Sequence, residues 1–320
     1  MSLVIFVIAL ILIFICYEYY RFVRHVKKHL DHIPAPPALP FMGHIMYFAN
    51  PKEILKDLVT MAQNFDGFVK IHFFQIYSLI ITDPEKIEKI LGTTRMLNKS
   101  SEYSHFNRWL GTGLLTSEPA KWRKSRKMLT PTFHFQILEK YIDLTGRNST
   151  FTHPDVTLCT LDVICETAMG TSVNAQKHSN SEYVKSVQIM NEIIRTRLFS
   201  PFKRFNCIYY LTGDYRAEKR ALKTIHGYTT SVIEKRKKEL EENGNYIIDC
   251  NSNSKKRLAF LDLLLQCELD EKPLTNEQIR EEVDTFMFEG HDTTASAMAF
   301  SLYCLAREFT RTGFSSKGIE

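Results

Sequence analysis

The sequence predicts a mainly α-helical protein with a small β-sheet near its N-terminus and an N-terminal transmembrane helix. Apolar residues recur at helical spacing through most of the 320 residues. Strand-like stretches are few, and the clearest, residues 67–83, "GFVKIHFFQIYSLIITD", is typical of a hairpin. With 44% hydrophobic residues the chain can bury a sizeable core. Its net charge of +5 is modest and mostly local, so we expect no nucleic-acid partner.

Residues 1–24 are expected to form a membrane anchor. The stretch 3–17, "LVIFVIALILIFICY", is uniformly apolar, and aromatic residues complete a span. Four cations follow at once: Arg21, Arg24, Lys27 and Lys28. By the positive-inside rule they leave the C-terminal side in the cytosol, which suits the endoplasmic reticulum membrane. The alternative is a cleaved signal peptide, although a cationic start and a small-residue cleavage site are missing.

Residues 25–44 form a basic and proline-rich hinge. Pro34, Pro36, Pro37 and Pro40 make its second half stiff and extended. It would hold the following domain in a fixed orientation to a membrane, and the alternative is a plain linker. Seven scattered cysteines without a CxxC pair indicate a reducing compartment.

The remaining elements follow in order. A helix over 51–65 precedes the hairpin, and another over 83–91 starts with Asp83 as its cap and Pro84 at its first position. Long helices are then predicted over 119–143, 157–170, 181–198 and 214–241, before a polar loop over 242–257. Thr275 and Gln278 have capping-box spacing and open a helix that runs to about Arg307. The end of the chain, 308–320, has no periodicity.

This last helix has an unusual centre, "EVDTFMFEGHDTTAS", residues 282–296. Gly290, Thr293, Thr294 and Ala297 make a stripe of small side chains on one face. Threonine hydroxyls that bond back to carbonyls, together with a glycine, could open the hydrogen-bond ladder and leave a polar notch. Asp292 could then relay protons, and Thr293 could orient a small ligand. The alternative is a tight crossing with another helix.

A second candidate site lies in "EPAKWRKSRKML", residues 118–129. Trp122 and Arg126 are four residues apart on one helical face, where an indole N–H and a guanidinium make a carboxylate clamp. The remaining cations are expected on an exposed surface: Lys121, Arg123, Lys124 and Lys127. The alternative is a solvated basic helix that packs one tryptophan.

Taken in order, these segments resemble cytochrome P450, the haem-thiolate monooxygenases. The match comprises the anchor, the proline hinge, "LGTGLLTSEPAKWRKSRKMLTPTFH", "TLCTLDVICETAMG" and "EEVDTFMFEGHDTTAS". It is most similar to family 4, which is rich in fatty-acid hydroxylases and includes many insect members. The resemblance implies a partial P450 catalytic domain over 45–307 and a divergent tail over 308–320.

The resemblance also implies roles for individual residues. Asp292 and Thr293 match the acid–alcohol pair that delivers protons in oxygen activation, and Gly290 would leave room for haem and oxygen. Glu289 matches the glutamate that can form an ester to a haem methyl in family 4. Trp122 and Arg126 match the pair that holds a haem propionate. Implied partners are NADPH-cytochrome P450 reductase, which passes on the electrons of NADPH, cytochrome b5, membrane lipid and a lipid-like substrate.

The chain also departs from the family pattern. The family's iron ligand is a cysteine in a glycine-flanked loop after the central helix, but no cysteine follows Cys304 here. We therefore assign no residue to the metal, since the axial cysteine is absent from this chain. The downstream ExxR is also missing. Two hypotheses follow: a membrane-bound monooxygenase recorded incompletely, or an inactive truncated splice or pseudogene product that remains as a membrane-anchored helical remnant.

Overall fold

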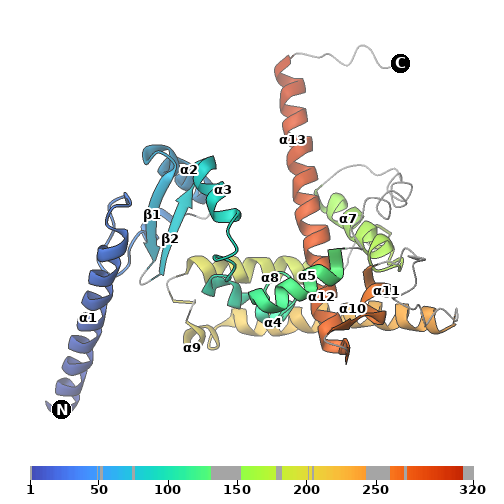
Figure 1. Ribbon diagram of the computed structural model, residues 1–320, viewed down its shortest axis with the longest axis horizontal. Coiled ribbons are helices and arrows are strands. Elements are labelled where there is room, and N and C mark those ends of the chain that lie inside the picture. Colours follow the sequence, from blue (N-terminus) through green and yellow to red (C-terminus); the bar gives the residue numbers. More distant parts are fainter. Residues whose placement is uncertain are drawn as a thin grey trace. The chain divides into compact units, whose positions relative to one another are not determined.

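The computed structural model describes residues 2–48, 50, 53–73, 76–130, 153–177, 182–200, 202–203, 205–242, 260–269 and 272–312. The chain divides into two compact units, Met1–Leu97 with Phe199–Phe205, and Asn98–Leu198 with Asn206–Glu320. Figure 1 shows the elements of both. The predicted class, mainly α-helical with a small antiparallel sheet, is confirmed.

The first unit is built around the predicted hairpin. Its elements are α1 (Ser2–Leu30), η1 (Ile45–Phe48), α2 (Ile54–Asn64), β1 (Phe68–Phe73), β2 (Ile76–Ile81) and α3 (Pro84–Leu91). The two strands pair antiparallel, with Phe68 opposite Ile81. The side chain of Asp83 accepts hydrogen bonds from the first backbone N–H groups of α3, as predicted for a cap followed by proline. A small core of Phe48, Met61, Val69 and Ile71 joins η1, α2 and β1.

The proline-rich stretch is bonded to β1. The N–H of Lys70 donates to the carbonyl of Pro34 at 2.8 Å, and the N–H of His44 donates to the carbonyl of His72 at 2.8 Å. The buried ring of His44 also lies with Nε2 3.0 Å from the Pro36 carbonyl. These bonds attach the hinge to the sheet, so a plain linker does not describe it.

The predicted anchor is helical, but its transmembrane character is not confirmed. None of the helices among the described residues combines the length and the apolar character that crossing a membrane requires. Helix α1 also continues past the predicted boundary at residue 24 to Leu30.

The second unit is almost entirely helical. Its elements are η2 (Ser101–His105), α4 (Asn107–Leu110), α5 (Pro119–Leu129), α7 (His153–Thr167), α8 (Glu182–Phe199), α9 (Asn206–Tyr209), α10 (Gly213–Glu242), α11 (Phe260–Gln266), β3 (Glu268–Leu269), β4 (Lys272–Pro273), α12 (Asn276–Phe288), η5 (Glu289–Thr293) and α13 (Thr294–Thr312). One core joins α7, α8, α10, α11 and α12 through residues such as Leu161, Met190, Ile225, Leu261 and Met287.

The long predicted helices are confirmed where the structure describes them. Residues 131–143 and 243–257, which include parts of a predicted helix and the predicted polar loop, lie outside the described residues. Thr275 and Gln278 form the predicted capping box at the start of α12. Helix α13 continues α12 and η5 as one long element (Figure 1) and ends at Thr312. The predicted tail therefore begins inside a helix, and 313–320 lie outside the described part.

Candidate functional site

The central helix changes its hydrogen-bond pattern at the predicted notch. Between α12 and α13, residues Glu289–Thr293 form one stretch of π-helix. The hydroxyl of Thr293 donates to the carbonyl of Glu289 at 2.5 Å, which competes with the regular backbone ladder. Gly290 weakens the helix at the same point, and such π-helical bulges are frequent at functional sites. The predicted opening of the ladder is confirmed.

The stripe of small residues divides into two parts. A Cβ on Gly290 would lie 2.6 Å from Cδ1 of Ile164, so Gly290 allows α7 to pack tightly against η5. This contact is the helix crossing that the sequence left open as the alternative. Thr293, Thr294 and Ala297 are instead exposed. The predicted role of Gly290 beside haem stays a prediction.

Two carboxylates flank the notch. Asn191 of α8 donates from Nδ2 to Oδ2 of Asp292 at 3.1 Å, which holds that half-buried side chain in one orientation. Glu289 is also half-buried, and its pKa is raised, mainly by burial and further by the charge of Asp292. Burial therefore favours a proton on Glu289 more than on an exposed glutamate.

His291 points away from solvent, into the core. Its Nδ1 lies 2.6 Å from the carbonyl of Met287, and its backbone carbonyl accepts a hydrogen bond from the hydroxyl of Thr160 at 3.0 Å. Burial lowers the pKa of His291, so the ring is neutral near neutral pH. Helix α7 thus supports the notch through both Ile164 and Thr160.

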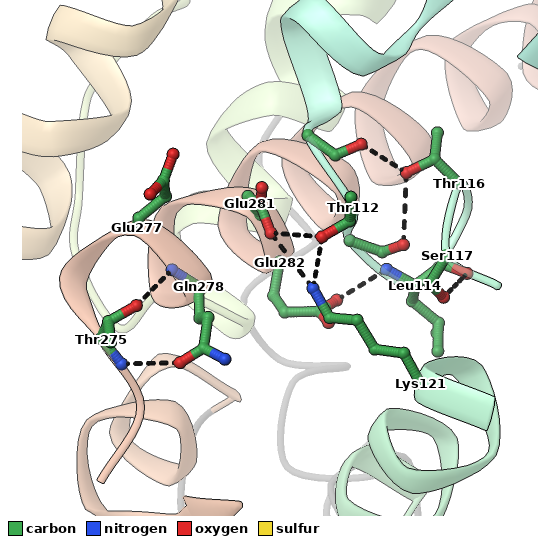
Figure 2. Close-up of polar contacts among 12 residues, drawn as sticks. Thr112, Leu114, Thr116, Ser117, Lys121, Thr275, Glu277, Gln278, Glu281 and Glu282 are labelled. Atoms are coloured by element: carbon green, nitrogen blue, oxygen red, sulfur yellow. Dashed lines mark hydrogen bonds and ion pairs between the residues drawn. The ribbon is translucent and has the colours of Figure 1, made fainter. Parts of the chain in front are cut away.

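The segment before α5 is fastened to α12, as Figure 2 shows. Gly111 has a φ of 55°, and a Cβ there would lie 2.1 Å from Oε1 of Glu281, so only glycine fits. The Glu281 carboxylate accepts from the hydroxyl of Thr112 at 3.1 Å and pairs with Lys121 at 3.2 Å. Glu282 accepts from the N–H of Leu114 at 3.0 Å. These contacts fix the start of α5 beside the central helix.

One part of the predicted cationic surface is therefore wrong. Lys121 is half-buried in an ion pair with Glu281, whereas Arg123, Lys124 and Lys127 are exposed as expected. Trp122 is half-buried and Arg126 is exposed on α5. Their role as a propionate clamp stays a prediction.

The cysteines that the structure describes do not gather into a metal site. The described free cysteines include Cys159 and Cys165 on α7 and the exposed Cys304 on α13. Burial raises the pKa of Cys165 to about 12, so it remains a thiol. Within the described ranges no group of three or more His, Cys, Asp or Glu side chains is placed to hold a metal ion.

Comparison with known proteins shows the family. The family model for cytochrome P450 matches residues 33–310. Cytochrome P450 4d10 of Drosophila mettleri is 41% identical over 286 residues, which cover 84% of this chain and 56% of the relative. The chain belongs to the cytochrome P450 family.

Further relatives confirm the resemblance to family 4. Cytochrome P450 4V2 of Mus musculus is 40% identical over 83% of this chain and 55% of its own length. Cytochrome P450 4c21 of Blattella germanica is 42% identical over 240 residues, which cover 70% of this chain and 48% of the relative. This P450 chain therefore spans about half the length of the curated relatives that it matches.

P450 proteins bind haem, and several described side chains have the chemistry that a haem site needs. The exposed Thr293, Thr294 and Ala297 give a surface of small side chains against which a flat group can lie. Trp122 and Arg126 offer N–H donors suited to a propionate. The chemistry of these side chains suits haem, their arrangement around it stays a prediction, and we assign no axial ligand among the described residues.

Sequence reasoning missed three contributors. Asn191 and Tyr183 of α8 approach the notch from about 100 residues earlier in the chain, and no local pattern marks them. Glu281 fastens α5 to α12, and its place at the start of the motif over 281–296 does not mark that role. The paired glycines Gly111 and Gly113 were the available signal, because a GTG turn often marks a close backbone approach.

Proposed function

We propose that this chain belongs to a membrane-bound haem monooxygenase of the family 4 kind. It would insert one oxygen atom from O2 into a C–H bond of a fatty-acid-like, hormone-like or xenobiotic substrate. Electrons would come from NADPH through NADPH-cytochrome P450 reductase, with cytochrome b5 as a second candidate donor. The observation that carries this proposal is the π-helical notch, which places a held carboxylate and a hydroxyl beside an open surface.

Each residue of the notch has a distinct task in this proposal. Bound haem would supply the iron that activates O2, held at its propionate edge by Trp122 and Arg126. Asp292 would hold and transfer protons, since Asn191 occupies Oδ2 and leaves Oδ1 for a water or hydroxyl. The Thr293 hydroxyl gives its hydrogen to the Glu289 carbonyl, so its lone pairs can accept a hydrogen bond from a ligand.

Membrane attachment through α1 is the second part of the proposal. Apolar side chains of this helix are exposed, among them Ile5, Phe6, Ile13 and Phe14, each at 60% or more. Lys27 and Lys28 lie in its last turn, where they would meet anionic lipid headgroups. The site of attachment would be the cytosolic face of the endoplasmic reticulum membrane. Deleting residues 1–24 should move the protein from the microsomal pellet to the supernatant, and an unchanged distribution would contradict this.

Reductase docking would use the basic side of α5. Arg123 and Lys127 are exposed there, and an acidic electron donor would be attracted to them. Charge reversal of both residues should raise the KM for reductase more steeply at low ionic strength than at high ionic strength. A KM for reductase that does not depend on ionic strength in either the wild type or the charge-reversed variant would contradict docking at this surface.

The proton-delivery role can be tested in a chimera with a C-terminal portion taken from cytochrome P450 4d10 of Drosophila mettleri. Dodecanoic acid serves as the probe substrate, with NADPH and reductase. Asp292→Asn and Thr293→Ala should cut product formation at least about tenfold with unchanged haem content. Ser301→Ala is the matched control, because Ser301 also donates to a carbonyl four residues back, that of Ala297 at 2.8 Å. Equal turnover in all four proteins would refute the assignment.

The inactive remnant is the alternative. Its motivating observation is that Cys304 of α13 lies eleven residues beyond Thr293, about 16 Å along the helix at 1.5 Å per residue, too far to reach a group bound beside Thr293. Under this alternative, residues 1–320 with added haem give no thiolate-type Soret band in the reduced carbon-monoxide complex. Such a band, or NADPH-dependent product from this chain, would eliminate the remnant hypothesis. Sequencing the full transcript for a downstream cysteine loop is the complementary test.

A further inference from the structure

Two side chains on one face of α8 point toward the π-helical segment. Tyr183 and Asn191 are eight residues apart, slightly more than two helical turns, and so share a face. Asn191 donates to Asp292 at 3.1 Å. The ring of Tyr183 lies 5.8 Å from the ring of His291, with 52° between their planes. Helix α8 therefore approaches two consecutive residues of η5.

The hydrogen position on His291 follows from its contact with Met287. A carbonyl oxygen only accepts, so Nδ1, at 2.6 Å from it, carries the hydrogen. In the neutral ring Nε2 is then an acceptor. Nε2 is fully buried and has no hydrogen-bond partner among the described residues. A buried acceptor without a donor costs free energy that a nearby donor would recover.

Tyr183 offers the matching donor. Its hydroxyl is buried and, within the described part of the chain, also has no hydrogen-bond partner. Burial, with smaller contributions from Asp284, Cys165, Tyr228 and Asp292, raises its pKa well above the ordinary value, so the hydroxyl keeps its proton. An unpaired donor and an unpaired acceptor thus lie on neighbouring rings in the same core.

We propose that α8 positions the π-helical segment through both side chains. Tyr183 donates a hydrogen bond that reaches Nε2 of His291 through one buried water, and Asn191 fixes the carboxylate of Asp292. Both are positioning residues, because they act through His291 and Asp292. Their relevance to proton delivery rests on the proposed function, but the two contacts themselves do not, and they can be measured without haem.

The Tyr183 contact is tested by nitrogen NMR of histidine-labelled residues 1–320. The resonance of His291 is identified by its loss in His291→Gln. We expect the Nδ1–H form of the ring, and Tyr183→Phe should move the Nε2 resonance toward that of a free acceptor while Nδ1 changes little. Tyr228→Phe is the matched control, since its ring packs 4.7 Å from that of Tyr183. An Nε2 resonance that is unchanged by Tyr183→Phe overturns this contact.

The Asn191 contact is tested by a double-mutant cycle in the unfolding of the same chain. Asn191→Ala and Asp292→Ala should each lower the folding equilibrium constant. Together they should lower it about tenfold less than the product of the single effects, as for a hydrogen bond to a charged group. Asn191→Ala with Glu192→Ala is the control pair, because Glu192 bonds Arg195 on the exposed side of α8. Independent effects of Asn191→Ala and Asp292→Ala would overturn the positioning role.

Discussion

Asp284 on α12 should make the stability of the protein depend on pH. Its side chain is fully buried. Among the described residues, only its Oδ1 receives a hydrogen bond, from the hydroxyl of Thr229 at 2.6 Å. Oδ2 lies 3.7 Å from Nε2 of His226 and 3.7 Å from Nε of Arg280, too far for hydrogen bonds. Burial consequently raises the pKa of Asp284 to about 7, although Thr229 and Arg280 both act to lower it.

The direction in which stability changes with pH follows from the raised pKa of Asp284. The folded protein binds this proton more tightly than the unfolded chain, so the stabilisation is complete below the ordinary pKa of 3.8 and is lost as the pH rises through about 7. At 1.36 kcal/mol per pKa unit, the change from 3.8 to about 7 corresponds to about 4 kcal/mol. Asp284→Asn keeps the shape and an acceptor for Thr229 but cannot ionise.

The measurement is urea unfolding of wild type and Asp284→Asn between pH about 4 and about 8. The difference in unfolding free energy should change by about 4 kcal/mol in favour of the variant as the pH rises. Glu277→Gln is the control, because Glu277 faces the same Arg280 at 3.9 Å from an exposed position. A pH-independent difference between wild type and Asp284→Asn would refute the reasoning.

Three further predictions concern the site and its surroundings. Cys165, buried with its pKa raised to about 12, should resist thiol alkylation in the folded protein while the exposed Cys304 reacts, and labelling of both at equal rates would contradict the core packing. Arg126→Ala should weaken haem binding, measured by Soret titration, by about 1 kcal/mol or less because Arg126 is exposed, whereas Lys127→Ala should leave it unchanged. In a haem-loaded protein after turnover, acid extraction should leave some haem on the polypeptide, and Glu289→Ala should release all of it; complete release from wild type would give the carboxylate another role.

Local chemistry made much of the fold predictable. Asp83 with Pro84 and Thr275 with Gln278 are capping signals that act within a few residues, and both were confirmed. The notch was predictable for the same reason, since a hydroxyl four residues after a carbonyl can bond to it whatever surrounds the helix.

Tertiary packing decided what the sequence did not reveal. Asn191 reaches Asp292 across 101 residues, and Lys121 reaches Glu281 across 160, so neither pair leaves a periodic signal. Gly290 was predicted to face a cofactor, yet its bare Cα lies against Ile164, because the same small side chain serves a helix crossing equally well. The exposure of Arg126 likewise depends on what covers α5, which its own residues do not determine.

Binding of haem against the open surface of the central helix is tested most directly by blocking that surface. Thr293→Trp places a large ring within the exposed surface of small side chains that also includes Thr294 and Ala297. Tyr303→Trp places one at an exposed position further along α13. Haem is titrated into residues 1–320 and the Soret absorbance is followed to saturation. We expect one haem per chain for wild type and Tyr303→Trp, and no saturable binding for Thr293→Trp. Equal binding by wild type and Thr293→Trp would contradict the proposal that haem lies against this surface.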